Sequence, residues 1–309
     1  MMAENKVRDL IKQRQGNKKG NFIEKIIPII LFLIACVSVL TTLGIVFTLL
    51  FETITFFTRV SIVEFFTNNN WAAFNAEPEW GIFPLVLGTL KITAIAAVVS
   101  VPLGLGAAIY LSEYATDKAR RIIKPILEVL AGIPTIVYGF FALTFVTPLL
   151  KNIVPDLNIF NALSPGIVVG IMIIPMIASL SEDAMNSVPN ALREGALGLG
   201  ATKFEVAMKV VLPAALSGIL ASVVLGLSRA IGETMIVSIA AGSSPNNTLS
   251  ITDTIQTMTG YIVQVATGDA TYGSDVYFSL YAVGTTLFVF TLVMNIISQW
   301  ITRRFREEY

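Results

Sequence analysis

The sequence contains no histidine and a single cysteine, Cys36. Histidine is the commonest general base and the commonest metal ligand, so its absence argues against acid–base catalysis and against a zinc site. One cysteine cannot form an internal disulfide, and because Cys36 lies inside an apolar run it is expected to be a packing residue. The chain also lacks a GxxxxGK loop followed by Ser or Thr, the usual means of binding ATP. No cofactor, metal ligand or catalytic residue is expected, and an enzyme is disfavoured.

Charge is also scarce. Only 14% of the 309 residues are charged, 54% are hydrophobic, and the mean hydropathy is +0.74. A soluble domain of this length carries more charge, so the composition indicates an integral membrane protein. A helix crosses the hydrocarbon core with roughly 20 apolar residues. We therefore predict an all-α protein with six transmembrane helices, at residues 26–51, 82–110, 122–150, 163–180, 214–241 and 278–301.

Lys and Arg are distributed unevenly between the loops. They gather in residues 1–25, in the loop after the second span, in the loop of residues 181–213 and in the tail 303–309, whereas the opposite loops hold only Arg59 and Lys151. Cytoplasmic loops carry such an excess. Both termini and the 181–213 loop are therefore predicted to be cytoplasmic, and the first span is interpreted as an uncleaved signal anchor.

Two connections are predicted to be external. Residues 52–80 contain Trp71 and Trp80, whose amphipathic rings suit the membrane–water boundary. In the second connection, 242–277, apolar residues recur at 255, 258, 262 and 265, the spacing of one helix face. This face either packs on the external ends of the spans or belongs to a docking surface for an external partner.

The loop between the fourth and fifth spans shows helix signals. Pro189 is typical of a first helical turn, and Gly200 is typical of a helix end. Thr202 and Glu205 form T-x-x-E, a capping box that predicts a second helix ending or kinking at Pro213. The loop is thus predicted to be helix, glycine corner, helix. It is either an amphipathic pair on the bilayer surface or a rigid knob that docks into a soluble partner.

Three spans contain residues that call for explanation. Arg229 and Glu233 lie four residues apart in the fifth span, where they share a helix face and are expected to form a salt bridge. The pair is either structural or part of a substrate path in which Arg229 binds an oxyanion. Lys91, in the second span, either snorkels to the outer interface or adds positive charge to an anion path. Gly132 and Pro134 mark a tolerated kink or a hinge or gate in the third span.

The 193–213 stretch resembles a family signature. Glu194-Gly195-Ala196, then Gly200, then Leu212-Pro213 is similar to the EAA–G–I-x-LP pattern of permease subunits of ABC importers, although Gly195 replaces the usual Ala. The resemblance implies a type I importer core over about 83–302, to which the first span is an addition. It also implies coupling helices at 187–212, in which the matching residues contact a cytoplasmic ATPase.

Two further stretches resemble one particular type of importer permease. RAIGETM at 229–235 and AGIPTIVYGFFAL at 131–143 resemble the PstC-type permeases of phosphate importers. The resemblance implies that Arg229 and Glu233 act in phosphate translocation by alternating access. It also implies a cell-membrane location, a sister permease in a heterodimer, two cytoplasmic ATPase subunits and an external phosphate-binding protein, with lipid around the spans and no nucleic acid.

The resemblance leaves alternatives open. The 193–213 signature specifies the ATPase contact and not the cargo, so a related importer for sulfate or molybdate remains an alternative. A carrier or channel that works without an ATPase is a second alternative.

Overall fold

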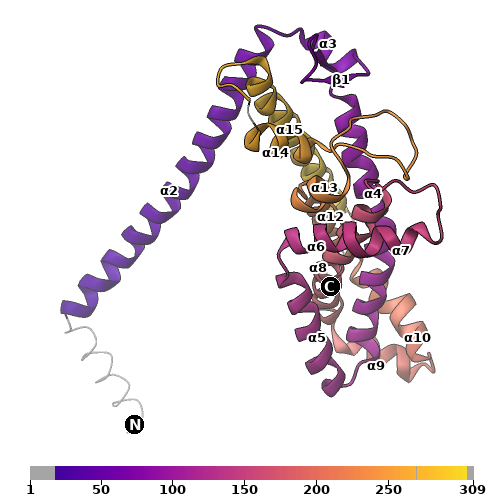
Figure 1. Cartoon of the computed structure of the whole chain (residues 1–309). Coiled ribbons are helices and arrows are strands. Elements are labelled where there is room, and N and C mark those ends of the chain that lie inside the picture. The colour runs from indigo at the N-terminus through magenta and orange to yellow at the C-terminus, as the bar shows by residue number, and fades with distance from the viewer. Residues whose placement is uncertain (1–17, 269, 305–309) are drawn as a thin grey trace. The chain divides into compact units, whose positions relative to one another are not determined.

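The computed structural model describes residues 18–268 and 270–304 (Figure 1). Most of the predicted basic segment 1–25 and of the tail 303–309 lies outside the described residues. The chain divides into two compact units, Met1–Glu52 and Thr53–Tyr309. The described part of the first unit is the helix α2 (Lys18–Phe57), whose last residues belong to the second unit. Its span Ile26–Phe57 is long and apolar enough to cross a membrane.

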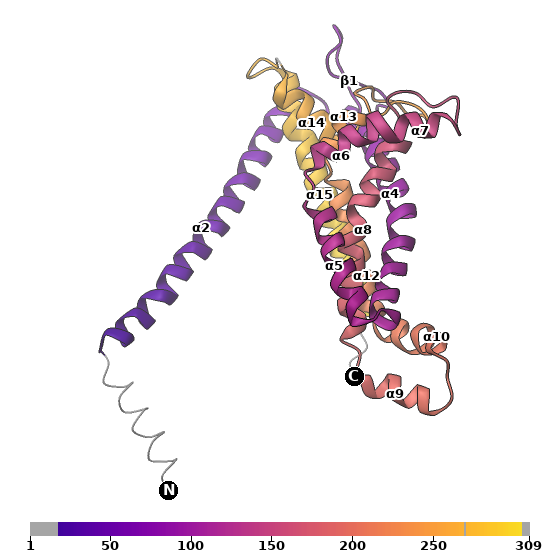
Figure 2. The same cartoon turned by 60° about the horizontal axis from the view of Figure 1, so that its bottom comes forward.

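Long helices form the core of the second unit. They are α4 (Phe83–Ile109), α8 (Leu163–Asn186), α12 (Leu216–Ile231) and α15 (Asp275–Arg304). α8 packs along α4 and α12, and α12 also packs against α15 (Figures 1 and 2). Gly226 permits the close approach of α12 to α8, because a Cβ added there would lie 2.9 Å from Ile177 Cγ1. The predicted second, fourth and sixth spans are therefore confirmed as helices.

The predicted third span is not one straight helix. α5 (Asp117–Gly132) and α6 (Thr135–Phe141) meet at a break, and the pair Asp117–Gly132 and Thr135–Lys151 is bent by 88°. Pro134 lacks an N–H and has an extended ψ of 136°, so the helix cannot continue through it. The remainder of this stretch, η2 (Ala142–Val146) and α7 (Thr147–Lys151), runs transverse to the long helices (Figures 1 and 2).

The predicted fifth span is also divided. The segment before α12 consists of α10 (Lys203–Val206), η3 (Ala207–Val211) and α11 (Leu212–Ala214). It meets α12 at a bend of 73°, and the break falls at Ala215 rather than at Pro213. A second break, at Gly232–Thr234, separates α12 from α13 (Met235–Ala240). Within the described residues, four helices are long and apolar enough to cross a membrane, or up to six if each bent pair is one span.

Between residues 18 and 304, as far as the structure describes them, three π-helical turns interrupt the helices. They are η1 (Tyr110–Tyr114) at the end of α4, η2 after α6, and η3 after α10. In each, a backbone N–H bonds to a carbonyl five residues earlier: Ala115 to Tyr110, Thr147 to Ala142, and Leu212 to Ala207. Such turns hold one residue more than an α-turn and often mark functional positions.

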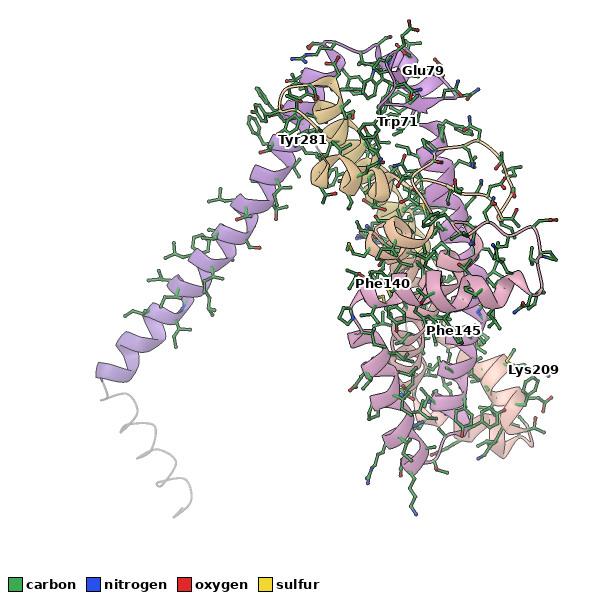
Figure 3. All side chains as sticks on the ribbon, viewed as in Figure 1. Trp71, Glu79, Phe140, Phe145, Lys209 and Tyr281 are labelled. Atoms are coloured by element: carbon green, nitrogen blue, oxygen red, sulfur yellow. The ribbon has the colours of Figure 1, made fainter. Side chains whose placement is uncertain are left out.

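One end of the second unit is covered by short elements. They are α3 (Ile62–Thr67), the antiparallel pair β1 (Trp71–Ala72) and β2 (Glu79–Trp80), and α14 (Met258–Thr267). Figure 3 shows Trp71 and Glu79 at this end. Trp71 and Trp80 are each only 5% exposed and pack edge to face at 5.7 Å. The two rings therefore pack inside the protein, and their placement at the membrane–water boundary stays a prediction. The buried Tyr261 ring completes this aromatic core 4.8 Å from Trp71, and burial raises the pKa of its hydroxyl.

The apolar residues at 255, 258 and 265 are buried, although the helix begins only at Met258. They support the packing alternative for this face. The opposite end of the unit carries α9 (Asn190–Gly198), α10 and the start of α5, and it holds most of the described Lys and Arg residues. We call it the basic end (lower end in Figure 2).

Candidate functional site

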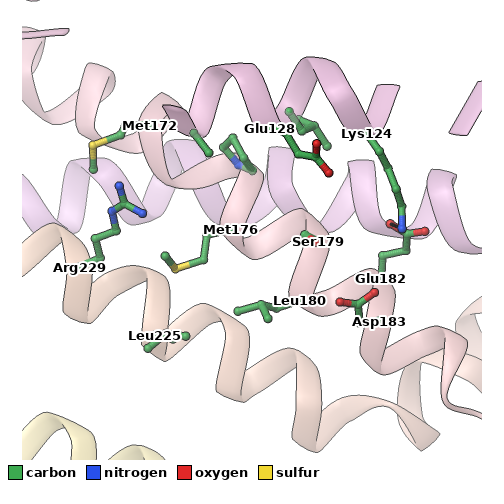
Figure 4. Close-up of a pocket in the computed structure, with 13 residues that line it drawn as sticks. Lys124, Glu128, Met172, Met176, Ser179, Leu180, Glu182, Asp183, Leu225 and Arg229 are labelled. Atoms are coloured by element: carbon green, nitrogen blue, oxygen red, sulfur yellow. Dashed lines mark ion pairs between the residues drawn. The ribbon is translucent and has the colours of Figure 1, made fainter. Parts of the chain in front are cut away.

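A pocket of about 520 Å³ lies between α5, α8 and α12 (Figure 4). Arg229 is at one end of the pocket, whereas Lys124, Glu182 and Asp183 are at the other. Apolar and small side chains separate the two charged ends. The intervening side chains include Met176, Ser179 and Leu180, whereas Met172 lies beside Arg229. The pocket therefore has a single guanidinium at its deep end and mixed charge toward the basic end.

Arg229 lies in the last turn of α12 and is exposed in the pocket. No carboxylate among the described residues forms an ion pair with its guanidinium. At 1.5 Å per residue, it lies roughly 20 Å along α12 from the basic end. An unpaired guanidinium at this depth is costly in a membrane, and its planar fork of donors suits a tetrahedral oxyanion. The geometry therefore favours anion binding at Arg229.

The expected salt bridge between Arg229 and Glu233 is wrong. Gly232 ends α12, so Glu233 does not continue the helix face on which Arg229 lies. Its carboxylate is buried, and its Oε1 accepts hydrogen bonds from the backbone N–H groups of Met235, at 3.0 Å, and Ile236, at 3.2 Å. Glu233 therefore caps the first turn of α13 instead of holding Arg229.

This capping role predicts how two substitutions differ. Glu233→Gln keeps a side-chain oxygen that can accept from the same N–H groups, whereas Glu233→Ala leaves them without a partner. We expect the alanine variant to lose about 1 kcal/mol of stability and the glutamine variant to lose less. Thermal unfolding of the purified protein in detergent measures the difference. Equal melting temperatures for the two variants would contradict the capping role.

The structure does not bring Lys91 into the pocket with Arg229. Its side chain is buried, and its Nζ donates to the carbonyls of Thr248 and, at 3.4 Å, Ser250. Both acceptors belong to the connection that follows α13. Lys91 therefore fastens this connection to α4, on the half of α4 that lies away from the basic end.

The 187–213 segment has the predicted helix–corner–helix form. Gly200 has a φ of +89°, a conformation that L side chains rarely adopt. The capping box is confirmed: Thr202 Oγ1 accepts from the Glu205 N–H at 3.3 Å, and Glu205 Oε2 accepts from the Thr202 N–H at 3.0 Å. The pKa of the Glu205 carboxyl is lowered, mainly because the carboxylate accepts a hydrogen bond from the backbone N–H of Thr202. A hydrogen bond from the Lys209 side chain is the next largest cause.

The residues that match the EAA pattern lie mainly on the surface of this segment. Glu194, Gly195 and Gly200 are exposed, Ala196 and Leu212 are half-buried, and Pro213 is exposed. Large apolar side chains are exposed beside them. These are Leu197 at 44%, Leu199 at 91%, Phe204 at 64% and Met208 at 45%. An apolar patch of this kind at a polar end marks an interaction surface.

Arg193, which sequence analysis counted only as a basic residue, fixes this segment to the bundle. Its guanidinium forms an ion pair of 3.1 Å with Glu113 in η1, and donates to the carbonyls of Met185, at 2.7 Å, and Val188, at 2.6 Å. Both side chains are largely buried, 16% and 10% exposed. One side chain on α9 thus joins the end of α8 to the end of α4. No local pattern indicates this, because the partners are distant in sequence.

Sequence analysis also missed the ion pair between Lys124 on α5 and Glu182 on α8, at 3.1 Å. The available signal was a carboxylate in an apolar helix, but the predicted fourth span ended at residue 180 and left Glu182 in the loop. Gly132 and Pro134, the predicted hinge or gate, are both exposed at the break between α5 and α6.

Comparisons with known proteins agree with this architecture. The family described as binding-protein-dependent transport system inner membrane component matches residues 100–307. A probable ABC transporter permease, YqgH of Bacillus subtilis, is 35% identical over 79% of both chains. The phosphate transport system permease protein PstC of Mesorhizobium japonicum is 34% identical over 78% of both chains. The permease of a bacterial alginate ABC transporter shares the fold, with a TM-score of 0.63 and 17% identity over 90% of this chain and 95% of that one.

The fold, the bent spans and the exposed segment at the basic end define a polytopic α-helical permease of the type I ABC importer class. The chain belongs to the family of binding-protein-dependent transport system inner membrane components, and it is similar to the PstC permeases of phosphate transport systems.

Proposed function

We propose that this chain is the permease subunit of an ATP-driven importer that moves inorganic phosphate across the cell membrane by alternating access. The observation that carries the proposal is the unpaired Arg229 in the pocket between α5, α8 and α12. Similarity to PstC permeases supports phosphate rather than another oxyanion as the cargo. Glu233 and Lys91 then support the path by capping α13 and fastening the connection that follows it.

The proposed partners follow from the surfaces of the second unit. A sister permease would close the pocket on the side where Arg229 is exposed. Two cytoplasmic ATPases would bind the exposed residues of the 187–213 segment, because the chain lacks an ATP-binding loop of its own. An external phosphate-binding protein would dock at the opposite end. The break at Gly132 and Pro134 is the proposed hinge of the pathway.

Phosphate uptake tests the proposal directly. Cells that carry the gene should accumulate radiolabelled phosphate faster than cells that lack it, and excess sulfate should not compete. Competition by sulfate or molybdate would instead indicate a related importer for another oxyanion. Transport by the purified chain alone, without an ATPase, would refute the importer assignment in favour of a carrier or channel.

Charge reversal at Glu194 tests the ATPase contact. Glu194 is exposed in α9, so Glu194→Lys should leave the fold unchanged but place a cation on the docking surface. We expect co-purification with the ATPase, or transport-linked ATP hydrolysis, to fall about tenfold, because like-charge or unpaired charge at an interface commonly costs 1–2 kcal/mol. Glu64→Lys, at the opposite end, is the matched control. Normal ATPase binding and hydrolysis in the Glu194 variant would contradict the assignment.

A further inference from the structure

A second cavity adjoins the pocket that contains Arg229. It has a volume of about 510 Å³ and lies toward the basic end, where Arg120 and Arg121 contribute to its lining. The two cavities share Lys124, Glu128 and Glu182 as lining residues. The Lys124–Glu182 ion pair therefore lies at the boundary between them. Any solute that moves from Arg229 to the basic end along these cavities has to pass this pair.

Glu182 is the fixed partner of the ion pair. Its side chain is 1% exposed, and its Oε2 lies 3.1 Å from Lys124 Nζ without a hydrogen bond from any described group. Its Oε1 accepts only a long hydrogen bond, 3.4 Å, from Asn186. Removing the cation from a buried carboxylate is strongly unfavourable. Glu182 therefore holds Lys124 in place when no other anion is available.

Lys124 is the movable partner. Its side chain is 42% exposed, and its ammonium is a compact charge on a flexible four-carbon stem. It lies about 10 Å along α5 from the basic end, whereas Arg229 lies roughly twice as deep in α12. Figure 4 shows Lys124 and Arg229 at opposite ends of the pocket. An oxyanion that leaves Arg229 can thus meet Lys124 next.

Negatively charged side chains surround the ion pair. Glu128 and Asp183 line the pocket beside Lys124, so together with Glu182 they repel an anion that is not neutralised. An anion passes this ring only by competing with Glu182 for the Lys124 ammonium. Once it has moved on to the second cavity, Lys124 returns to Glu182 and the boundary closes.

We propose that the Lys124–Glu182 ion pair is an inner gate of the permease, which opens only when a permeating oxyanion replaces Glu182 as the partner of Lys124. The proposal rests on the proposed function and adds to it a second positioning point for the anion, separate from Arg229. In this gate Lys124 binds the permeating anion, and Glu182 reseals the path by pairing with Lys124 again.

The test uses the complete importer in proteoliposomes loaded with phosphate. Neutralising the resealing carboxylate alone, Glu182→Gln, leaves the Lys124 ammonium, whose side chain is 42% exposed, free to pair with the anion. We expect phosphate efflux in the absence of ATP to rise at least about tenfold. Neutralising the acidic partner of an exposed pair, Asp275→Asn in the pair of Arg59 and Asp275, is the matched control and should not change efflux.

A second measurement does not depend on the cargo. Ser179→Cys, in a Cys36→Ser background, places a thiol in the Arg229 pocket beyond the gate. A membrane-impermeant, negatively charged thiol reagent applied at the basic end should label it about tenfold faster in the Glu182→Gln variant. Wild-type efflux and unchanged labelling in the Glu182→Gln variant would overturn the gate, as would loss of complex assembly, which would make the pair purely structural. A wild-type importer that moves no phosphate would refute the proposed function, whereas the labelling result would still decide the gate.

Discussion

Replacing Arg229 with glutamine is expected to lower phosphate uptake by about 10- to 100-fold, because a hydrogen bond to a charged group contributes about 1.5–3 kcal/mol. Glutamine keeps a polar side chain with two donors but loses the positive charge and the planar fork. Because no described carboxylate pairs with Arg229, its removal leaves no buried charge uncompensated, and the importer should still assemble. The initial rate of radiolabelled phosphate uptake, normalised to the amount of complex in the membrane, measures the effect.

The matched control for this variant is Arg59→Gln. Arg59 pairs with Asp275 at 3.0 Å, but both side chains are about half exposed. An exposed pair of this kind contributes at most about 1 kcal/mol, so uptake should stay close to normal. Arg229→Lys should fall between the two, since it keeps the charge and loses the fork. Near-normal uptake by Arg229→Gln would remove Arg229 from the path and with it the main support for an anion as cargo.

The second large effect is expected at Arg193. Arg193→Met keeps the length of the side chain but removes its ion pair with Glu113 and its bonds to the carbonyls of Met185 and Val188. Breaking one side of a largely buried pair costs about 3 kcal/mol or more. α9 has only nine residues, too few to hold its orientation without tertiary contacts. We therefore expect ATP hydrolysis to persist while phosphate uptake falls at least about tenfold.

Uncoupling is measured as the ratio of ATP hydrolysed to phosphate transported in proteoliposomes. Lys209→Met is the control, because Lys209 lies in the same segment but its pair with Glu205 is exposed, with the lysine side chain 74% accessible. Its ratio should equal that of the wild type. An unchanged ratio in Arg193→Met would show that the joint between α9, α8 and η1 does not transmit the motion of the ATPases.

Local chemistry predicted the parts of this fold that depend on neighbouring residues. The capping box of Thr202 and Glu205 and the left-handed Gly200 are confirmed because both need only a few adjacent residues. The apolar stretches located the long helices for the same reason. The break at Gly232 was missed, since one glycine is often tolerated inside a transmembrane helix. The expected salt bridge of Arg229 and Glu233 failed with it, because the i to i+4 rule holds only within an unbroken helix.

The remaining parts of the site depend on tertiary packing. Lys124 meets Glu182, and Arg193 meets Glu113, only after α5, α8 and α9 have assembled. Residues 58 or 80 positions apart carry no shared periodicity, so charge counting recorded Lys124 and Arg193 only as basic residues and did not indicate their partners. The 88° bend lies at Gly132 and Pro134, where a kink or a hinge or gate was predicted, and beyond it α6 packs against α13, a tertiary contact that the local sequence does not indicate.

In the three π-helical turns described above, the number of residues affects the orientation of the flanking helices more than the identity of the side chains does. Each turn holds one residue beyond the α-helical repeat, and one residue corresponds to a rotation of about 100° around a helix axis. One further residue inserted within Ala207–Val211 would exceed what the π-helical turn holds and would turn α10 and the capping box by about 100° relative to α11. Leu199 and Phe204 would then face a different direction without any change in their own chemistry. Substitutions in these turns should consequently be tolerated far better than insertions or deletions of one residue.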